Sequence, residues 1–241
     1  MAQPPEKLRP GQFGGQGPSH MPFWNLIGQT ETMTSVFSIL GRGRAGRALA
    51  AAWGDRVELL PGSAAPEGLV LLAVPDHAVA GCAQRFPGRC AHLSGSLHLE
   101  GVPSAHPLTS FTGEAGDWRG TPLALTGAVP EPILAAFAAL GFAPFELPGQ
   151  LKPLYHACAV LASGHAATLW LGAGALLEEA GVRLPGRGLG ALAAVTAANV
   201  ERLGPAGRTG PFVRGDEATI ARDAQALPGP WRDLFLDLGN L

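Results

Sequence analysis

Residues 36–53 read VFSILGRGRAGRALAAAW: an apolar run, a glycine-rich turn and an alanine-rich run. The first run predicts a buried β-strand, and the last predicts an α-helix. Between them, Gly41, Gly43 and Gly46 have the spacing G-x-G-x-x-G. In a strand–turn–helix unit, the first glycine makes the tight bend and the second lets the backbone approach a ligand closely. The third packs the helix against the sheet.

The start of the predicted helix is an anion-binding position. Its first amide N–H groups lack intrahelical partners and carry partial positive charge. Together with the glycine spacing, this predicts a turn for the pyrophosphate of a dinucleotide cofactor. The residues of this predicted cofactor turn are Gly41, Arg42, Gly43, Arg44, Ala45 and Gly46. Because the chain contains 34 glycines, a coincidental glycine-rich turn is the alternative.

The end of the second predicted strand, residues 57–60, lacks the usual acidic residue. Pro61, Gly62 and Ser63 follow it, and none carries a carboxylate. Such a carboxylate holds the adenosine ribose 2′-hydroxyl of NAD. We therefore predict NADP, with NAD as the alternative cofactor, and expect Arg42, Arg44 or Ser63 to meet the 2′-phosphate. The other interpretation of the two arginines is that they are solvated loop cations.

The pattern of alternating strands and helices continues to about residue 147. Further strands are predicted at 69–74, 90–93, 122–125 and 142–147, and further helices at 77–86 and 130–140. This alternation predicts βαβ units and a mostly parallel sheet. Asp76 stands directly before one of these helices, where it is expected to be the N-cap or, alternatively, a ribose or substrate contact.

The character of the sequence changes at Pro148 and Gly149. Helices are predicted at 151–181, ending near Gly181, and at 189–203, 216–226 and 231–238. We therefore expect an α/β Rossmann domain over 35–148, followed by a smaller all-α domain over 149–241. Residues 1–34 are rich in Gly, Pro and Gln, and are expected to lie outside the fold as a disordered tail, tag or over-extended start.

The composition excludes several classes of protein. The formal net charge of −2 and the absence of a Lys/Arg block argue against a nucleic-acid-binding surface. Three cysteines without C-x-x-C spacing argue against a disulfide framework and fit a reducing cytoplasm. No uninterrupted apolar run reaches the roughly 18 residues that would span a bilayer. A cytoplasmic protein without membrane contact is predicted.

Polar residues at the ends of predicted strands form a candidate substrate site. Val74 and Pro75 end a central strand, where ligands bind in open α/β sheets, so they are expected beside the nicotinamide. Ser94, Gly95 and His106 lie near the ends of the next segments and are expected to hold a polar substrate group. His92, His98 and His106 lack a carboxylate or cysteine that would complete a tight set, so no metal site is predicted.

The helical part carries three further candidates. Lys152 and His156 are four residues apart and share one helix face, so they could act as proton donor and carbonyl polariser. Alternatively, Lys152 is a solvated cation and His156 a hydrogen-bonded core histidine. Arg214 could clamp a carboxylate or pair internally, and Asp216 is expected to cap the following helix.

Six motifs along the chain carry a family resemblance. In order, they are GRGRAGRALA, LLAVPDHAV, HLSGSL, AHPLTSF, LKPLYHACAVLASGH and GRTGPFVRGD. From about residue 35 onward, the chain resembles a bacterial family of Rossmann-like proteins with a helical C-terminal domain of unknown function. That family is grouped with the pyrroline-5-carboxylate reductase, 3-hydroxyisobutyrate dehydrogenase and 6-phosphogluconate dehydrogenase superfamily.

The resemblance implies a cofactor-binding domain, a helical dimerisation domain and a substrate cleft between them. Ser94 and Gly95 look like the substrate loop of the hydroxyacid dehydrogenases, and Lys152 resembles their helix lysine beside the substrate oxygen. His156 departs from that pattern, because those enzymes have asparagine there. A second departure is Gly164-His165 after Ala162-Ser163, where the family of unknown function commonly reads Ala-Ser-Asn.

The expected protein is a dimeric oxidoreductase that binds NADP. It would transfer a hydride to or from a small carbonyl, imine or hydroxy-acid metabolite, while Lys152 or His156 supplies the proton. The alternative is a non-catalytic, nucleotide-binding regulatory or scaffold protein, because a fold does not fix its function.

Overall fold

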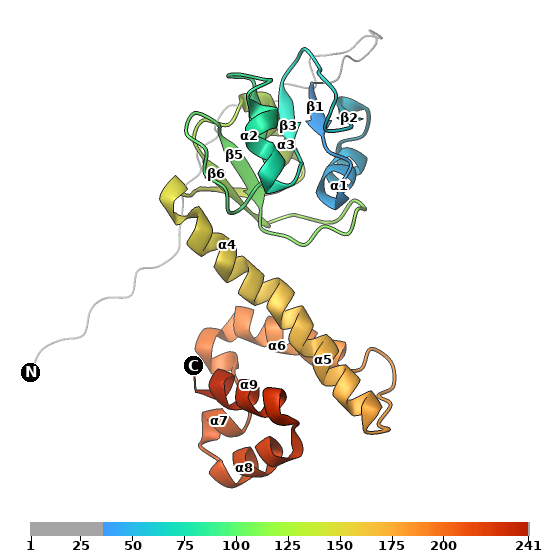
Figure 1. Cartoon of the computed structure of the whole chain (residues 1–241), viewed down its shortest axis with the longest axis vertical. Coiled ribbons are helices and arrows are strands. Elements are labelled where there is room, and N and C mark those ends of the chain that lie inside the picture. Colours follow the sequence, from blue (N-terminus) through green and yellow to red (C-terminus); the bar gives the residue numbers. More distant parts are fainter. Residues whose placement is uncertain (1–35, 241) are drawn as a thin grey trace, which may run out of the picture.

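The computed structural model describes residues 36–240, so the predicted tail at 1–34 lies outside the described residues. An α/β part lies at one end, and a long helix leads from it to a cluster of helices at the other (Figure 1). All strands among the described residues precede Leu147, and the chain from Gly149 onward is helical.

A seven-stranded sheet forms the centre of the α/β part. The strands are β1 (Phe37–Leu40), β2 (Val57–Leu60), β3 (Val70–Leu72), β4 (Cys90–His92), β5 (Ser104–Pro107), β6 (Pro122–Thr126) and β7 (Ala143–Glu146). Their order is β2-β1-β3-β4-β5-β6-β7, and every neighbouring pair is parallel except β5 with β6. The prediction of a Rossmann-type, mostly parallel sheet is confirmed.

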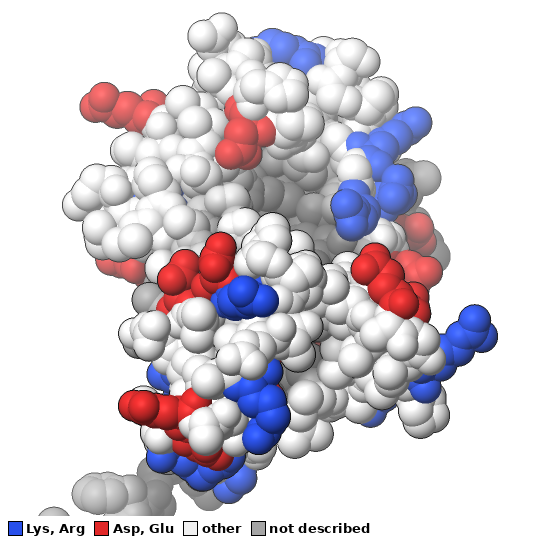
Figure 2. Space-filling view, turned by 60° about the horizontal axis from the view of Figure 1, so that its bottom comes forward, with Lys and Arg blue, Asp and Glu red and all other residues white. Residues whose placement is uncertain are grey.

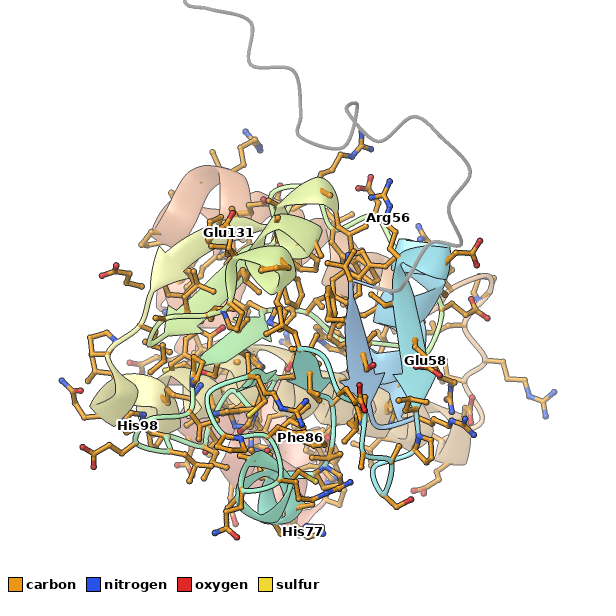
Figure 3. The ribbon with its side chains drawn as sticks, turned by 90° about the horizontal axis from the view of Figure 1, so that it is seen from above. Arg56, Glu58, His77, Phe86, His98 and Glu131 are labelled. Carbon is orange, nitrogen blue, oxygen red and sulfur yellow. The ribbon has the colours of Figure 1, made fainter. Side chains whose placement is uncertain are left out.

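Helices cover both faces of this sheet. They are α1 (Arg44–Trp53), α2 (Asp76–Ala83) and α3 (Glu131–Ala139). Viewed from above, Glu131 of α3 and His77 of α2 lie on opposite sides of the strands (Figure 3). The central strand β3 is buried over its whole length, with Leu71 packed on one side and Val70 and Leu72 on the other.

An aromatic cluster joins α1 to α3 on one face. Trp53 lies edge-on between Phe37 and Phe137, with ring centroids 5.3 and 5.1 Å apart. Its indole Nε1 donates to the carbonyl oxygen of Ala136 at 2.9 Å, so the large apolar ring is buried with its polar atom satisfied. Since α1 follows the glycine turn directly, this packing fixes the helix that begins there.

Strand β5 differs from the sequence expectation, which had no strand at these residues. It is short, contains no β-branched residue and ends at a proline, so local propensity does not indicate it. It forms because it pairs between β4 and β6, where Ser104 and Ala105 are almost completely buried. This pairing places His106 beyond the carboxyl end of β4, because the last residue of β4, His92, is in register with Ser104.

The connection between β2 and β3 contains no helix, and two arginines hold it in place. Arg85 donates to the carbonyl oxygens of Gly62 at 2.8 Å and Ser63 at 2.9 Å, and also to that of Ala64. Arg89 donates to three further carbonyl oxygens, those of Pro66, Glu67 and Gly68, at 2.9, 2.7 and 2.6 Å. In a crossover helix, backbone N–H groups would bond these carbonyl oxygens. In this helix-free loop, the two arginine side chains do so.

The long helix consists of α4 (Lys152–Val160), a π-helical turn (Leu161–His165) and α5 (Ala166–Glu179). The expected end near Gly181 is confirmed, and its φ of 79° explains why a glycine stands there. The prediction of one long helix is confirmed, and the π turn is an irregularity within it. There, Ser163 Oγ donates to the carbonyl of Ala159 at 2.6 Å, a bond that competes with regular helix pairing.

The last helices are α6 (Leu189–Leu203), α7 (Pro211–Arg214), α8 (Glu217–Ala226) and α9 (Gly229–Gly239). Asp216 caps α8 as expected, because its carboxylate accepts from the Thr219 N–H at 3.1 Å. The predictions did not include α7.

The expected N-cap role of Asp76 is wrong. Helix α2 begins at Asp76 itself, Pro75 occupies the N-cap position, and the Asp76 side chain makes no capping bond. Proline has a φ suited to the entry into a helix, so the helix starts one residue early. Asp76 therefore lies in the first turn, where the helix dipole favours a negative charge.

Candidate active site

The backbone of the predicted cofactor turn requires glycine at two of its three glycine positions. Gly41 has a φ of 118°, and a Cβ there would overlap the carbonyl oxygen of Ala73, the residue directly after β3. A Cβ on Gly46 would overlap the carbonyl oxygen of Gly41. Gly43 is different, because a Cβ there would meet no protein atom within 4 Å. Two glycines are thus needed for packing, while the third borders open space at the start of α1.

The groups around that open space can receive an anion. Gly43 is the N-cap of α1, and no side chain caps the helix, so its first N–H groups have no side-chain partner from the cap. Arg42 and Arg44 are exposed beside it. Arg47 Nη1 donates to the carbonyl oxygen of Arg42 at 3.0 Å, so this carbonyl of the turn has a hydrogen-bond partner.

The loop after β2 lies against the end of β3. A Cβ on Gly62 would stand 3.4 Å from Val74 Cγ1, and Ser63 is exposed on the same loop. Because β1, β3 and β4 are parallel, Gly41, Val74 and Gly95 follow their strands at one edge of the sheet. The predicted residues for the cofactor and those for the substrate therefore share this edge.

Lys152 is the buried centre of the residues predicted for the substrate. Its side chain is 1% exposed, and Nζ donates to the Ser94 carbonyl at 2.8 Å and to Ser104 Oγ at 2.7 Å. Desolvation lowers the pKa of Lys152 to about 8, and the charge of Asp76 opposes that shift. The alternative prediction, that Lys152 is a solvated cation, is therefore wrong.

Two histidines flank Gly95. A Cβ on Gly95 would lie 2.6 Å from His106 Nε2 and 2.8 Å from His156 Cδ2, so only a glycine fits between the two rings. The ring centroids of His106 and His156 are 6.0 Å apart. Burial and then the charge of Lys152 lower the pKa of His106 to about 4, so its imidazole is neutral near pH 7.

Tyr155 is a member of this site that the sequence analysis missed. Its hydroxyl lies 3.0 Å from His106 Nδ1, and the two rings meet edge to face at 5.5 Å. Burial raises the pKa of Tyr155, so the phenol keeps its proton at neutral pH. One available signal was its position three residues after Lys152, which places both on one side of the helix.

His92 and Asp76 lie behind these groups. His92 is buried, and its Nδ1 accepts from the Ser94 N–H at 3.2 Å. Desolvation, followed by the Lys152 charge, lowers the pKa of His92 to about 4. The carboxylate of Asp76 acts in the opposite direction on His92, His106 and Lys152, so it is an electrostatic partner of the cluster.

The remaining predicted site residue stands apart from this cluster within one chain. Arg214 is the exposed last residue of α7, in the group of helices at the other end of the molecule (Figure 1). His98 is exposed. Within residues 36–240, no three His, Cys, Asp or Glu side chains come together as a metal site.

The helix from Gly149 to Glu179 is long and apolar enough to cross a membrane, with a mean hydropathy of 1.4 over its most apolar window. Polar residues such as Lys152, His156 and His165 interrupt its sequence, so it contains no continuous apolar run of that length. A single such helix is weak evidence for a membrane, so the expectation of no membrane contact stays a prediction. Figure 2 shows acidic and basic side chains interspersed with wide uncharged areas on the face that it presents.

Residues 122–241 match the protein-family model described as "Domain of unknown function (DUF2520)". This match covers 120 of the 241 residues, the C-terminal part of the chain, and the matched segment is referred to as the DUF2520 domain. Lys152, Tyr155 and His156 belong to the DUF2520 domain, whereas the cofactor turn, Ser94, Gly95 and His106 precede it. The polar cluster is thus assembled from both halves. A search of curated proteins finds no match.

Solved structures share the fold over most of the chain. A Bacteroides fragilis protein provisionally assigned as an NADP oxidoreductase is 19% identical, with a TM-score of 0.68 over 85% of this chain and 96% of its own. A Thermotoga maritima protein is 20% identical, with a TM-score of 0.65 over the same shares. An Aspergillus terreus reductive aminase, solved with NADPH and ethyl levulinate, is 16% identical, with a TM-score of 0.53 over 86% and 92%.

Proposed function

We propose that this protein is an NADP-linked oxidoreductase that acts on a small carbonyl, imine or hydroxy-acid metabolite. The observation that carries the proposal is the buried Lys152, which bonds Ser94 and Ser104 at the sheet edge that also bears the cofactor turn. A buried cation with a lowered pKa, surrounded by neutral imidazoles, is typical of a site for proton transfer. A purely structural contact would not need this concentration of titratable groups.

The residues of the turn fit a dinucleotide. Gly41 and Gly46 permit the close packing, and Gly43 leaves space where the pyrophosphate would lie against the first N–H groups of α1. Val74 and Pro75 would border the nicotinamide, because they follow β3 at the same edge. A bound NADP(H) would supply or accept the hydride.

A preference for the 2′-phosphate follows from the loop after β2. The first residues of that loop, Pro61, Gly62 and Ser63, carry no carboxylate, and Arg85 holds their backbone in place. Arg42 and Arg44, exposed at the start of α1, would add positive charge on the phosphate side. The Aspergillus reductive aminase of similar fold was solved with NADPH, which supports this choice.

The proton that accompanies the hydride would come from Lys152 or His156. Lys152 is held behind Ser94 and Gly95, and its pKa of about 8 makes it an effective acid near neutral pH. His156 lies directly beside Gly95, where the substrate would enter. Ser94, Gly95 and His106 would hold the polar substrate atom. Arg214 would meet a substrate carboxylate only through another copy of the chain.

A second copy of the chain is also the proposed cover for the exposed apolar surface of the DUF2520 domain. Leu161, Leu171 and Leu192 are 62, 76 and 63% exposed. Burial of several such side chains would contribute about 1.5–3 kcal/mol each. Sedimentation equilibrium should give a dimer, and Leu171→Glu should shift it to a monomer. A monomeric wild type would contradict the proposed dimer.

The test of the function begins with calorimetric titration of the full chain with NADPH. A panel of imines, 2-keto acids and 3-hydroxy acids is then screened for a change at the nicotinamide absorbance band. Binding together with turnover of at least one class supports the proposal. Tight NADPH binding without turnover of any class would favour a regulatory role instead.

A further inference from the structure

Tyr155 and His106 form a pair that joins helix α4 to strand β5 of the α/β part. The phenol oxygen and His106 Nδ1 are 3.0 Å apart. Phe145 packs against the other side of the tyrosine, with ring centroids 6.1 Å apart. Tyr155 comes from α4 and His106 from β5, so the bond crosses between two elements that are 49 residues apart in the chain.

The direction of this hydrogen bond follows from the acidity of the two groups. A phenol is a far stronger acid than the N–H of a neutral imidazole, and an imidazole nitrogen is a better acceptor than a phenol oxygen. The favoured arrangement therefore has the Tyr155 O–H donating to His106 Nδ1. The hydrogen of the neutral imidazole must then be on Nε2, because the bond at one ring nitrogen sets the state of the other.

The second nitrogen of His106 faces the substrate loop. Nε2 lies 2.6 Å from the position that a Cβ on Gly95 would occupy, and His156 lies across the same position. Gly95 itself fills the space between the two rings, and a side chain there would displace them. Nε2 has no hydrogen-bond partner among the described residues, yet no buried side-chain nitrogen there lacks one, so Nε2 remains accessible to a ligand. An N–H at this position can bond a carbonyl oxygen or an imine nitrogen, whereas a bare nitrogen would repel it.

We propose that Tyr155 is a positioning residue that holds His106 in its Nε2–H tautomer, so that His106 presents a hydrogen-bond donor to the substrate's carbonyl oxygen or imine nitrogen. This inference rests on the proposed function for the identity of the substrate atom. The tautomer itself is a property of the protein alone. Tyr155 thereby selects substrates that accept a hydrogen bond at the reacting centre.

The charged groups around His106 are consistent with a neutral ring. Lys152 and His156 of α4 disfavour a second proton on it, and Asp76 of α2 favours one more weakly. Burial is the largest influence and also disfavours the imidazolium. A neutral ring must choose between its two nitrogens, and Tyr155 is the residue that bonds one of them.

The direct test is nitrogen-15 NMR of the histidine rings in the full chain without added ligand. His106→Gln identifies the His106 signals by their loss. The wild type should show a bare Nδ1 and a protonated Nε2, and Tyr155→Phe should give a mixture of both tautomers. A wild-type ring protonated at Nδ1, or a tautomer unchanged in Tyr155→Phe, would overturn the proposal.

Phe145→Leu is the matched control, because it removes packing on the tyrosine ring without touching the hydroxyl. It should leave the His106 tautomer unchanged. If Phe145→Leu altered the tautomer as much as Tyr155→Phe, packing and not the hydrogen bond would set it, and the proposal would be wrong.

A second measurement uses the fact that Tyr155 is the only tyrosine in the chain. Ultraviolet titration of tyrosinate therefore reports this residue alone. Donation to His106 stabilises the neutral phenol, so His106→Leu, which offers neither donor nor acceptor, should lower the Tyr155 pKa relative to wild type, by about half to one pH unit. A rise would mean that the bond runs the other way and would refute the inference.

Turnover and NADPH binding of the Tyr155→Phe variant test the role of Tyr155 separately from the proposed function. Once a substrate is found, Tyr155→Phe should lower kcat about five- to tenfold, the effect of one hydrogen bond, with an unchanged Kd for NADPH. Failure of the wild type to bind NADPH would refute the proposed function and leave the tautomer result standing. An unchanged kcat in Tyr155→Phe would refute the positioning role alone.

Discussion

Gly43→Val separates cofactor binding from folding. Gly43 has φ −69° and ψ −178°, which any residue adopts, and a Cβ there would meet no protein atom within 4 Å. The folded protein should therefore accept valine. Valine is a poorer N-cap than glycine, which costs less than about 1 kcal/mol. The melting temperature should change by only a few degrees.

The loss of cofactor affinity should be much larger. The valine side chain would occupy the space where the pyrophosphate meets the first N–H groups of α1. A hydrogen bond to a charged group is worth about 1.5–3 kcal/mol, so the loss of two amounts to about 3–6 kcal/mol. With about 1.4 kcal/mol for each tenfold change, the Kd for NADPH should rise at least about a hundredfold.

Gly46→Val is the matched control. A Cβ on Gly46 would overlap the carbonyl oxygen of Gly41, so this variant should lose both stability and binding. Calorimetric titration with NADPH and thermal melting of both variants provide the assay. A Gly43→Val protein that binds NADPH with wild-type affinity would refute the assignment of the turn. A Gly43→Val protein that fails to fold would contradict the open space seen beside Gly43.

Three further predictions concern the cofactor, the proton donor and pH. NADPH should bind more tightly than NADH, and Arg42→Ala with Arg44→Ala should reduce the difference; equal wild-type affinities would exclude a 2′-phosphate site. Lys152→Ala and His156→Ala should each lower kcat by about 10²–10⁴-fold with little change in NADPH affinity. Two variants with wild-type turnover would remove both residues from the mechanism. Burial lowers the pKa of His92 and His106 to about 4, so between that pH and the unfolded value of about 6.5 the unfolded chain binds more protons. The free energy of unfolding, measured by urea titration, should therefore fall as the pH drops through this window. The double variant His92→Gln, His106→Gln should make this dependence on pH weaker. A wild type whose free energy of unfolding did not change between these pH values would contradict the burial of both rings as neutral groups.

The parts of the fold that follow local rules could be predicted from the sequence. The glycine turn is fixed by the backbone of a few adjacent residues, and the long apolar run of β3 indicates a strand buried on both faces. Strand β5 could not be predicted in this way, because its existence depends on pairing with β4 and β6. The same holds for the loop after β2, which depends on Arg85 more than 20 residues away.

The candidate site was predictable only in part. Lys152 and His156 stood out by their spacing on one helix face, but nothing local indicated that Lys152 would be buried against Ser104. Tyr155 was missed because its partner, His106, belongs to the strand that was also missed. The sequence predicts a helix cap at Asp76, whereas the influence of Asp76 on Lys152 arises only in the assembled sheet edge.

The measurement that tests the central claim most directly is the oxidation of NADPH by the full chain in the presence of the screened imines and keto acids. The account predicts a loss of absorbance at the nicotinamide band with at least one of these classes. It also predicts that Lys152→Ala slows that loss at unchanged NADPH affinity. An unchanged absorbance with every class, in a protein that binds NADPH tightly, would contradict the claim that this chain is an oxidoreductase.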